Sequence, residues 1–228
     1  MGRPLRTSLG GYVYHVLCQG IQPKGIFRSD QDYEDFESVL SEATQRFEPR
    51  ILAYCCLQNH WNLVLVPRRD GDLSRLIAWI TITHSARWHA KPRRSTTGGL
   101  YERRFKSFPV QDDVPLLDVL QYVESSPIRT RQTSATEWRW SSAYRRVAMS
   151  HQPSNGQFLS TPPVALPNDW DRRIKMEMDS DKIDRIERSI QRGAPFGSDE
   201  WVQRTAVKMN LESTLRPRGR PRKHEQRT

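Results

Sequence analysis

The sequence contains no long apolar run and no apolar segment close to its first residue. A helix needs about 20 predominantly apolar residues to cross a bilayer, and a secretory signal needs an apolar core of roughly 7–15 residues. We therefore expect a protein that neither spans a membrane nor is exported by a standard signal, and we expect it in the cytoplasm.

Cysteine is scarce, and its three residues, Cys18, Cys55 and Cys56, cannot all form disulfides with one another. The adjacent pair lies inside an apolar run and lacks the spacing of a zinc finger. Reduced thiols in the core of a cytosolic protein are the interpretation that this usage favours.

Acidic residues are fewer than basic ones. The 26 Asp and Glu face 36 Lys and Arg, so the net charge is +10. Such a balance favours an anionic partner, with nucleic acid first and an anionic membrane surface a distant second, although basic proteins of other classes share it. The length of 228 residues allows one domain with an appendage.

Apolar periodicity predicts elements in the order β-α-β-β-α-β-α. The strands are expected at 11–17, 50–57, 61–66 and 105–111, and the helices at 31–47, 72–89 and 114–126, where Pro127 stops the last one. This order favours an α+β fold, an antiparallel sheet with helices packed on it.

A polar triplet, His60-Trp61-Asn62, interrupts the third predicted strand and is followed by Leu-Val-Leu-Val. Side chains two apart on a strand project from the same face, so His60 and Asn62 point together while Trp61 points away. A hydrogen-bonded polar pair at a strand end and a functional site are both compatible with this pattern.

Five segments, in order, resemble motifs of the HUH single-tyrosine transposases, especially the REP-associated tyrosine transposase branch. They are Gly2-Arg3-Pro4-Leu5-Arg6 with Tyr14-His15-Val16, Asn59-His60-Trp61-Asn62-Leu63, the stretch 99–106, the stretch 122–129, and Trp138-Arg139-Trp140-Ser141-Ser142. The resemblance covers roughly residues 1–147 and implies a ferredoxin-like core.

The resemblance implies an enzyme that cuts and rejoins single-stranded DNA near hairpins. A tyrosine attacks a phosphodiester, becomes linked to the 5′ phosphate and releases a 3′ hydroxyl. Tyr122 matches the nucleophile, although an aromatic residue on a helix is also a common core residue. His15, His84 and His89 have no matching partner in the sequence, and we expect them to pack or to be exposed.

The family's metal site is altered in this chain. A divalent ion, Mg²⁺ or Mn²⁺, is implied at His60, Asn62 and Ser126, but the family has histidine in place of Asn62 and asparagine in place of Ser126. Amide and hydroxyl oxygens still coordinate hard cations, although more weakly than the original ligands. Glu124, two residues from Tyr122, is expected to face elsewhere on the helix.

These replacements leave two functions open. One is a working nuclease and strand transferase, and the other is a DNA-binding protein on the same scaffold whose catalysis has decayed. Basic residues that resemble the family's phosphate contacts are Arg103, Arg104 and Lys106, for which a solvated sheet edge is the competing interpretation. Trp138 and Trp140 fit a core better than base stacking.

The remainder of the chain divides into three parts. Residues 148–180, with four prolines among Ser, Asn and Thr, are expected to be a linker. Residues 181–212 are expected to form helices, either a helix-turn-helix-like DNA reader or a plain helical hairpin.

The basic tail, 213–228, resembles an AT-hook. The residues that carry this resemblance are Arg216, Arg218, Gly219, Arg220, Pro221, Arg222 and Lys223. Glycine and proline keep such a segment extended in the minor groove of A·T-rich duplex DNA, where the arginines bind; a generic basic tail is the alternative. The sequence indicates no oligomeric state.

Overall fold

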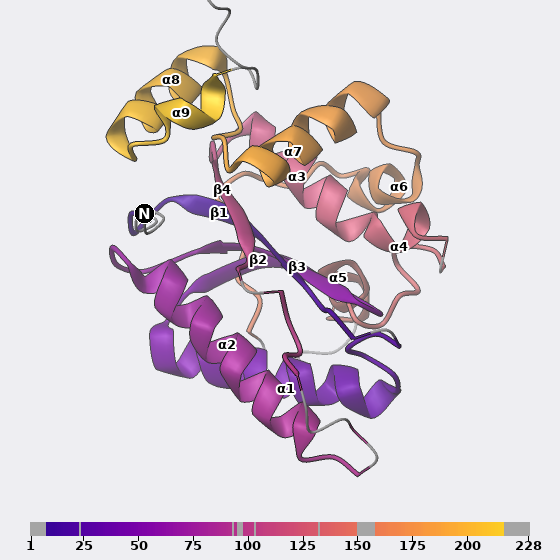
Figure 1. Ribbon diagram of the computed structural model, residues 1–228. Coiled ribbons are helices and arrows are strands. Elements are labelled where there is room, and N and C mark those ends of the chain that lie inside the picture. The colour runs from indigo at the N-terminus through magenta and orange to yellow at the C-terminus, as the bar shows by residue number, and fades with distance from the viewer. Residues whose placement is uncertain are drawn as a thin grey trace, which may run out of the picture.

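The computed structural model describes residues 8–22, 24–92, 94, 98–102, 104–131, 133–149 and 158–216. The chain forms a four-stranded antiparallel sheet between two layers of helices (Figure 1). The strands, in spatial order, are β2 (Arg50–Leu57), β3 (His60–Val66), β1 (Val13–Gln19) and β4 (Lys106–Val110). The predicted α+β class and its antiparallel, ferredoxin-like sheet are confirmed.

Each face of the sheet carries its own apolar core because side chains alternate along the strands. Helices α1 (Asp30–Phe47) and α2 (Asp72–His89) cover one face, where Trp61 and Cys56 are completely buried. Helix α3 (Val114–Glu124) covers the other face and packs on Cys55 and Val64. Trp61 and Val64, three positions apart, therefore lie in opposite cores. The three cysteines are buried thiols outside any disulfide, as expected.

Both edges of the sheet are paired with irregular segments. These segments occupy backbone N–H and C=O groups of the edge strands that could otherwise pair with another chain. On β4, the backbone N–H of Phe196 donates to Pro109 O at 2.9 Å, and Gln111 N–H donates to Phe196 O at 2.9 Å. On β2, isolated bridges join Cys55 to Ser141 and Ile51 to Leu159. The C-terminal half of the chain is thus attached to the sheet directly.

The third helix differs from its expected course. It ends at Glu124, and a short helix α4 (Ser126–Arg129) begins immediately afterwards. Pro127 lies in the first turn of α4, where its missing N–H has no intrahelical partner to lose. Pro127 therefore ends one helix by starting another, and Arg129 is carried back toward α3.

The segment expected to be a linker, 148–180, is packed where it is described. It contains the helix α6 (Trp170–Lys175), whose Trp170 and Ile174 are buried against the α3 side of the sheet. Its proline content indicated a connection, but two large apolar side chains at a spacing of four suffice to anchor one helical turn. Within the described residues, this segment therefore contributes side chains to the core.

Glu124 joins α3 to these later elements. Its carboxylate is fully buried and accepts from Ser142 Oγ at 2.5 Å, Arg146 Nε at 3.0 Å and Trp170 Nε1 at 2.8 Å. Ser142 and Arg146 belong to α5 (Ser142–Met149). The carboxylate is thus fully engaged in hydrogen bonds to later elements of the chain.

Replacing Glu124 by alanine is expected to lower the free energy of unfolding by about 3–5 kcal/mol, because it leaves a half-buried guanidinium and an indole N–H without their acceptor. Urea denaturation measures this loss. Glu200→Ala removes a carboxylate from an exposed pair with Arg204 at 3.6 Å and is expected to cost less than about 1 kcal/mol. Equal losses in the two variants would contradict the structural role of Glu124.

Three helices complete the chain. Helix α7 (Ser180–Arg192) packs on β4 and α3, while α8 (Asp199–Lys208) and α9 (Glu212–Leu215) pack together beyond the end of the sheet (Figure 1). Among the described residues, no helix combines the length and apolar character that crossing a membrane requires.

Candidate functional site

The predicted orientation of the polar triplet is confirmed. His60 and Asn62 project from the α3 face of β3, and Trp61 is buried in the opposite core. Asn62 is 3% exposed, whereas His60, at the start of the strand, is half-buried. The two side chains thus differ in access: His60 is open to a bound molecule, and Asn62 is enclosed.

Asn62 is enclosed by His15, which sequence reasoning did not connect to the site. His15 lies on β1, beside β3, and its Nε2 is 3.0 Å from Asn62 Oδ1. The imidazole stacks on Phe108 with ring centroids 5.0 Å apart and meets the Tyr122 ring edge-on at 6.2 Å. His15 packs in the core, as expected, but it does have a partner, which the sequence did not indicate because it comes from a neighbouring strand.

His15 is a neutral base inside the protein. Burial lowers its pKa to about 4. The hydrogen bond to Asn62 raises the pKa by a smaller amount, and the positive charge of Arg129 lowers it slightly. Because Asn62 Oδ1 only accepts, Nε2 carries the proton and Nδ1 keeps its lone pair. Among the described residues, Nδ1 has no hydrogen-bond partner.

This imidazole makes stability depend on pH. The unfolded chain protonates His15 near its ordinary 6.5, but the folded protein does so only near 4, so the unfolded state holds more protons between these values. The free energy of unfolding is expected to fall as pH drops through that window, by up to about 3 kcal/mol. His84, whose pKa burial lowers to about 3, acts in the same direction.

Urea titrations at several pH values between 7 and 4.5 measure this dependence. In His15→Gln the slope of unfolding free energy against pH is expected to become shallower. The slope that remains is the contribution of His84. A slope that is identical in the variant and the unmodified protein would contradict the assignment.

Tyr122 and Arg129 form the second half of the site. The Arg129 guanidinium lies 4.0 Å above the centre of the Tyr122 ring, in cation–π geometry. Burial raises the pKa of the Tyr122 phenol, while the positive charge of Arg129 and a hydrogen bond from it act in the opposite direction. Both side chains are half-buried.

Arg129 is held in place by two hydroxyls. It donates from Nη1 to Ser125 Oγ at 2.7 Å and from Nη2 to Ser126 Oγ at 2.9 Å. Burial lowers the pKa of His60, and Arg129 lowers it further. The guanidinium therefore lies within electrostatic range of both Tyr122 and His60, which are far apart in the sequence. The short helix α4 makes this possible by turning the chain back at Pro127.

The side chains of the implied metal site do not fit a divalent ion. Asn62 Oδ1 already accepts from His15, and Ser126 Oγ donates to Tyr122 O at 3.0 Å and accepts from Arg129. A second cation at Ser126 would face a guanidinium at bonding distance. Within the described part of the chain, no three His, Cys, Asp or Glu residues gather as metal ligands. Of the three implied ligands, only His60 keeps a ring nitrogen that could coordinate such an ion.

Three of the predicted DNA contacts, Arg104, Lys106 and Arg216, lie among the described residues. Arg104 and Lys106 are exposed near the start of β4. Arg103, the opening motif at 2–6 and the tail residues Arg218, Gly219, Arg220, Pro221, Arg222 and Lys223 lie outside the described residues; Arg216 is the last described residue and is exposed. Trp140 is 4% exposed and stacks on Tyr33, and Trp138 donates to Cys56 O at 2.8 Å, so both tryptophans are structural.

Comparisons with known proteins agree on one family. Residues 9–126, which include His60, Asn62, Tyr122 and Ser126, match the family model described as "Transposase IS200 like". A Haemophilus influenzae protein named as a REP-associated tyrosine transposase is 24% identical over 134 residues, which cover 54% of this chain and 76% of that protein.

A solved structure of a REP-associated tyrosine transposase bound to a REP hairpin has the same fold. It superposes with a TM-score of 0.56 at 15% identity and covers 70% of this chain and 94% of its own. Helices α7 to α9 lie beyond the matched family segment.

Proposed function

This chain belongs to the family of IS200-like transposases, and from that premise we propose that it cleaves and rejoins single-stranded DNA beside hairpins through a Tyr122–5′-phosphate bond. The observation that carries the proposal is the guanidinium of Arg129 stacked over the Tyr122 ring, on the sheet face that also presents His60. A phenol beside a fixed cation is an arrangement that suits attack on a phosphodiester.

In the first step the Tyr122 oxygen attacks phosphorus, an O–P bond forms, and the bond from phosphorus to the 3′ oxygen breaks. The released strand ends in a 3′ hydroxyl after taking up a proton. In the second step a 3′ hydroxyl attacks the phosphotyrosine, reforms a phosphodiester and returns the proton to Tyr122. Because each step exchanges one phosphodiester for another, the reaction needs no external energy source.

The phenol must lose its proton during attack. His60 is the proposed acceptor, because its lowered pKa keeps the imidazole neutral at pH 7 and its position at the strand start leaves it accessible. His15 is sealed behind Phe108 and Asn62 and instead positions the strand pair. The raised pKa of Tyr122 makes the phenolate rare, so the nearby positive charge lowers the cost of forming it.

Arg129 is the proposed phosphate-binding group. Its fork of N–H donors matches two oxygens of a phosphodiester, and it stabilises the charge that develops in the transition state. The two serines hold the guanidinium so that it does not have to be ordered when DNA arrives. The family's divalent ion enters no step of this scheme, because its implied ligands are engaged elsewhere.

The test uses a hairpin oligonucleotide with a single-stranded flank, labelled at its 3′ end. Since the 5′ phosphate becomes attached to the protein, the labelled 3′ fragment is expected to migrate with the protein on a denaturing gel. A 5′ label is expected to appear in a shorter free strand. Hairpin binding without a labelled protein band would refute cleavage and leave only DNA binding, and the absence of binding would refute the proposed function altogether.

Residues 1–147 are proposed as the catalytic part, with 158–216 as a region that supports it by packing on α3 and β4. Exposed Arg104 and Lys106 are proposed to contact phosphates of the single strand. The AT-hook-like tail is proposed to bind A·T-rich duplex DNA, a proposal that rests on its sequence alone.

A further inference from the structure

One face of α7 is basic, and the opposite face is apolar. Arg185, Arg188 and Arg192 recur at i, i+3 and i+7, which places them on one side of the helix. The other side carries Ile183, Ile186 and Ile190, which pack on the sheet and on α3. The isoleucines therefore fix the helix, and the arginines project away from the core.

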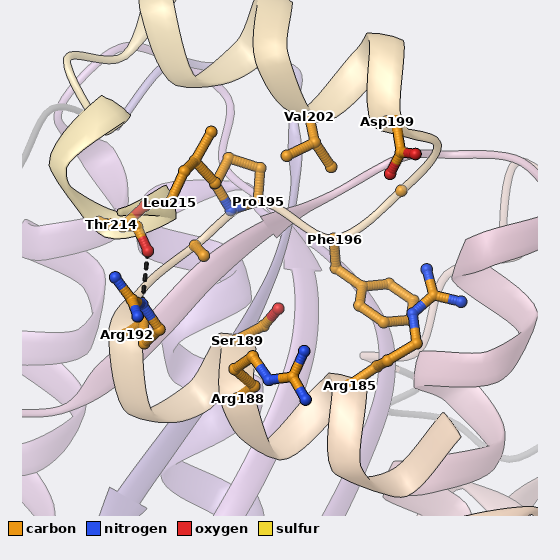
Figure 2. A pocket seen from close by; sticks show the side chains of 12 residues that line it. Arg185, Arg188, Ser189, Arg192, Pro195, Phe196, Asp199, Val202, Thr214 and Leu215 are labelled. Atoms are coloured by element: carbon orange, nitrogen blue, oxygen red, sulfur yellow. Dashed lines mark hydrogen bonds between the residues drawn. The ribbon is translucent and has the colours of Figure 1, made fainter. Parts of the chain in front are cut away.

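The arginines line a pocket of about 190 Å³ between α7, the loop 194–197 and the last two helices (Figure 2). In this view the Arg185, Arg188 and Arg192 side chains rise from α7 on one side, and Val202 and Leu215 face them from the other. The pocket is open to solvent along the arginine side, because Arg185 and Arg188 are exposed.

The positive charge of this pocket is not neutralised. Three arginines meet one acidic lining residue, Asp199, and within the described part of the chain none of the three forms a salt bridge. Two exposed arginines on neighbouring helices do have acidic partners: Arg173 pairs with Asp169 at 2.9 Å and Arg204 with Glu200 at 3.6 Å. An unpaired set of arginines around a concave surface suits an anionic ligand better than it suits folding.

The chemistry of the lining favours a phosphate backbone over stacked bases. Among the described residues, Phe196 is the only aromatic one that lines the pocket; it is 4% exposed, and the Arg185 guanidinium lies 5.3 Å from its ring centre. No open ring face is therefore available here for an unpaired base, which single-strand binding surfaces use. Guanidinium groups without a stacking ring recognise the charge and spacing of phosphates, as in protein contacts to the backbone of duplex DNA.

The pocket also marks where the basic tail begins. Arg192 donates from Nε to Thr214 O at 2.5 Å and from Nη2 to the carbonyl of Arg216. These bonds hold the end of α9 against α7, so the chain enters the tail directly beside the arginine face. On its other side, α7 packs on α3, and Glu187 is close enough to Tyr122 to raise the pKa of the phenol.

We propose that Arg185 and Arg188 bind successive phosphates of duplex DNA, the stem of the hairpin substrate, while Arg192 holds the end of α9 beside them. The proposal rests on the proposed function, since it assigns a second contact to the same substrate. It lies outside the segment that matches the family and does not require cleavage by Tyr122.

The experiment compares Arg185→Gln/Arg188→Gln with the unmodified full chain by fluorescence anisotropy on a labelled hairpin, between 50 and 200 mM salt. Each phosphate contact contributes about 0.9 to the slope of log affinity against log salt. The double variant is expected to bind roughly tenfold more weakly at low salt, with a slope shallower by about 1.8. Both arginines are exposed, so its unfolding curve is expected to be unchanged.

Arg173→Gln/Arg204→Gln is the matched control, because it removes the same charge from two exposed arginines that have acidic partners. Its slope and affinity are expected to stay within about twofold of the unmodified protein. Equal losses in both double variants, or no loss in either, would overturn the pocket as a binding site.

A third measurement separates this proposal from cleavage. On a single strand without a stem, the Arg185→Gln/Arg188→Gln variant is expected to form the Tyr122 adduct at the unmodified rate. If the unmodified protein binds hairpins with the expected loss in the variant but forms no adduct, the pocket stands and the proposed reaction fails. If the adduct forms but hairpin affinity is the same in the unmodified protein and in the Arg185→Gln/Arg188→Gln variant, the proposed reaction stands and the pocket is not a binding site.

Discussion

Tyr122→Phe is expected to abolish the covalent protein–DNA band, with cleavage falling by at least about 10⁴-fold, because no other group replaces the lost nucleophilic oxygen. Hairpin binding is expected to change less than about twofold. Phenylalanine keeps the ring beneath Arg129, so the cation–π contact and the packing on the sheet remain. Single-turnover cleavage of the 3′-labelled hairpin, with anisotropy on the same oligonucleotide, measures both quantities.

Tyr144→Phe is the matched control for this variant. Tyr144 is a half-buried tyrosine on α5, and loss of its hydroxyl is expected to leave cleavage unchanged. Persistent adduct formation in Tyr122→Phe would mean that another residue is the nucleophile. Loss of hairpin binding together with cleavage would instead place the role of Tyr122 in substrate binding.

Arg129→Gln is expected to reduce cleavage by about 10²–10³-fold, the size of effect that removing one transition-state donor has in other enzymes. Glutamine retains length and some hydrogen bonding to the two serines but has no charge. Arg129→Lys keeps the charge and loses the fork of donors, so we expect an intermediate rate. Arg131→Gln, an exposed arginine two residues away, is expected to change the rate less than about twofold.

The same assay tests the metal. In the unmodified protein, cleavage is expected to continue in EDTA, since the proposed cation is part of the chain. Thermal unfolding of each variant, measured alongside, separates a lost phosphate contact from a lost fold. Complete inhibition by EDTA combined with an unchanged rate in Arg129→Gln would show that a divalent ion does the work here assigned to Arg129.

Much of the architecture followed from local patterns in the chain. Alternation of apolar residues indicated the four strands, and the 3.6-residue period indicated α1, α2 and α3 to within a few residues. The facing of His60 and Asn62 followed from the same alternation, because the direction of a side chain on a strand depends only on its place in the strand. The boundary of α3 was misplaced, since Pro127 was interpreted as a stop and is the start of α4.

The composition of the site was decided by contacts between distant segments. His15 reaches Asn62 because β1 lies beside β3 with Leu17 opposite Asn62, and a strand's sequence does not state which strand will be its neighbour. Arg129 lies over Tyr122 because α4 turns the chain back across α3. The sequence by itself therefore determined the elements and the face of each side chain, which are local properties. Only the tertiary structure decided that an arginine and a second histidine bond to the side chains that were expected to hold a metal, because such proximity depends on how distant elements pack together.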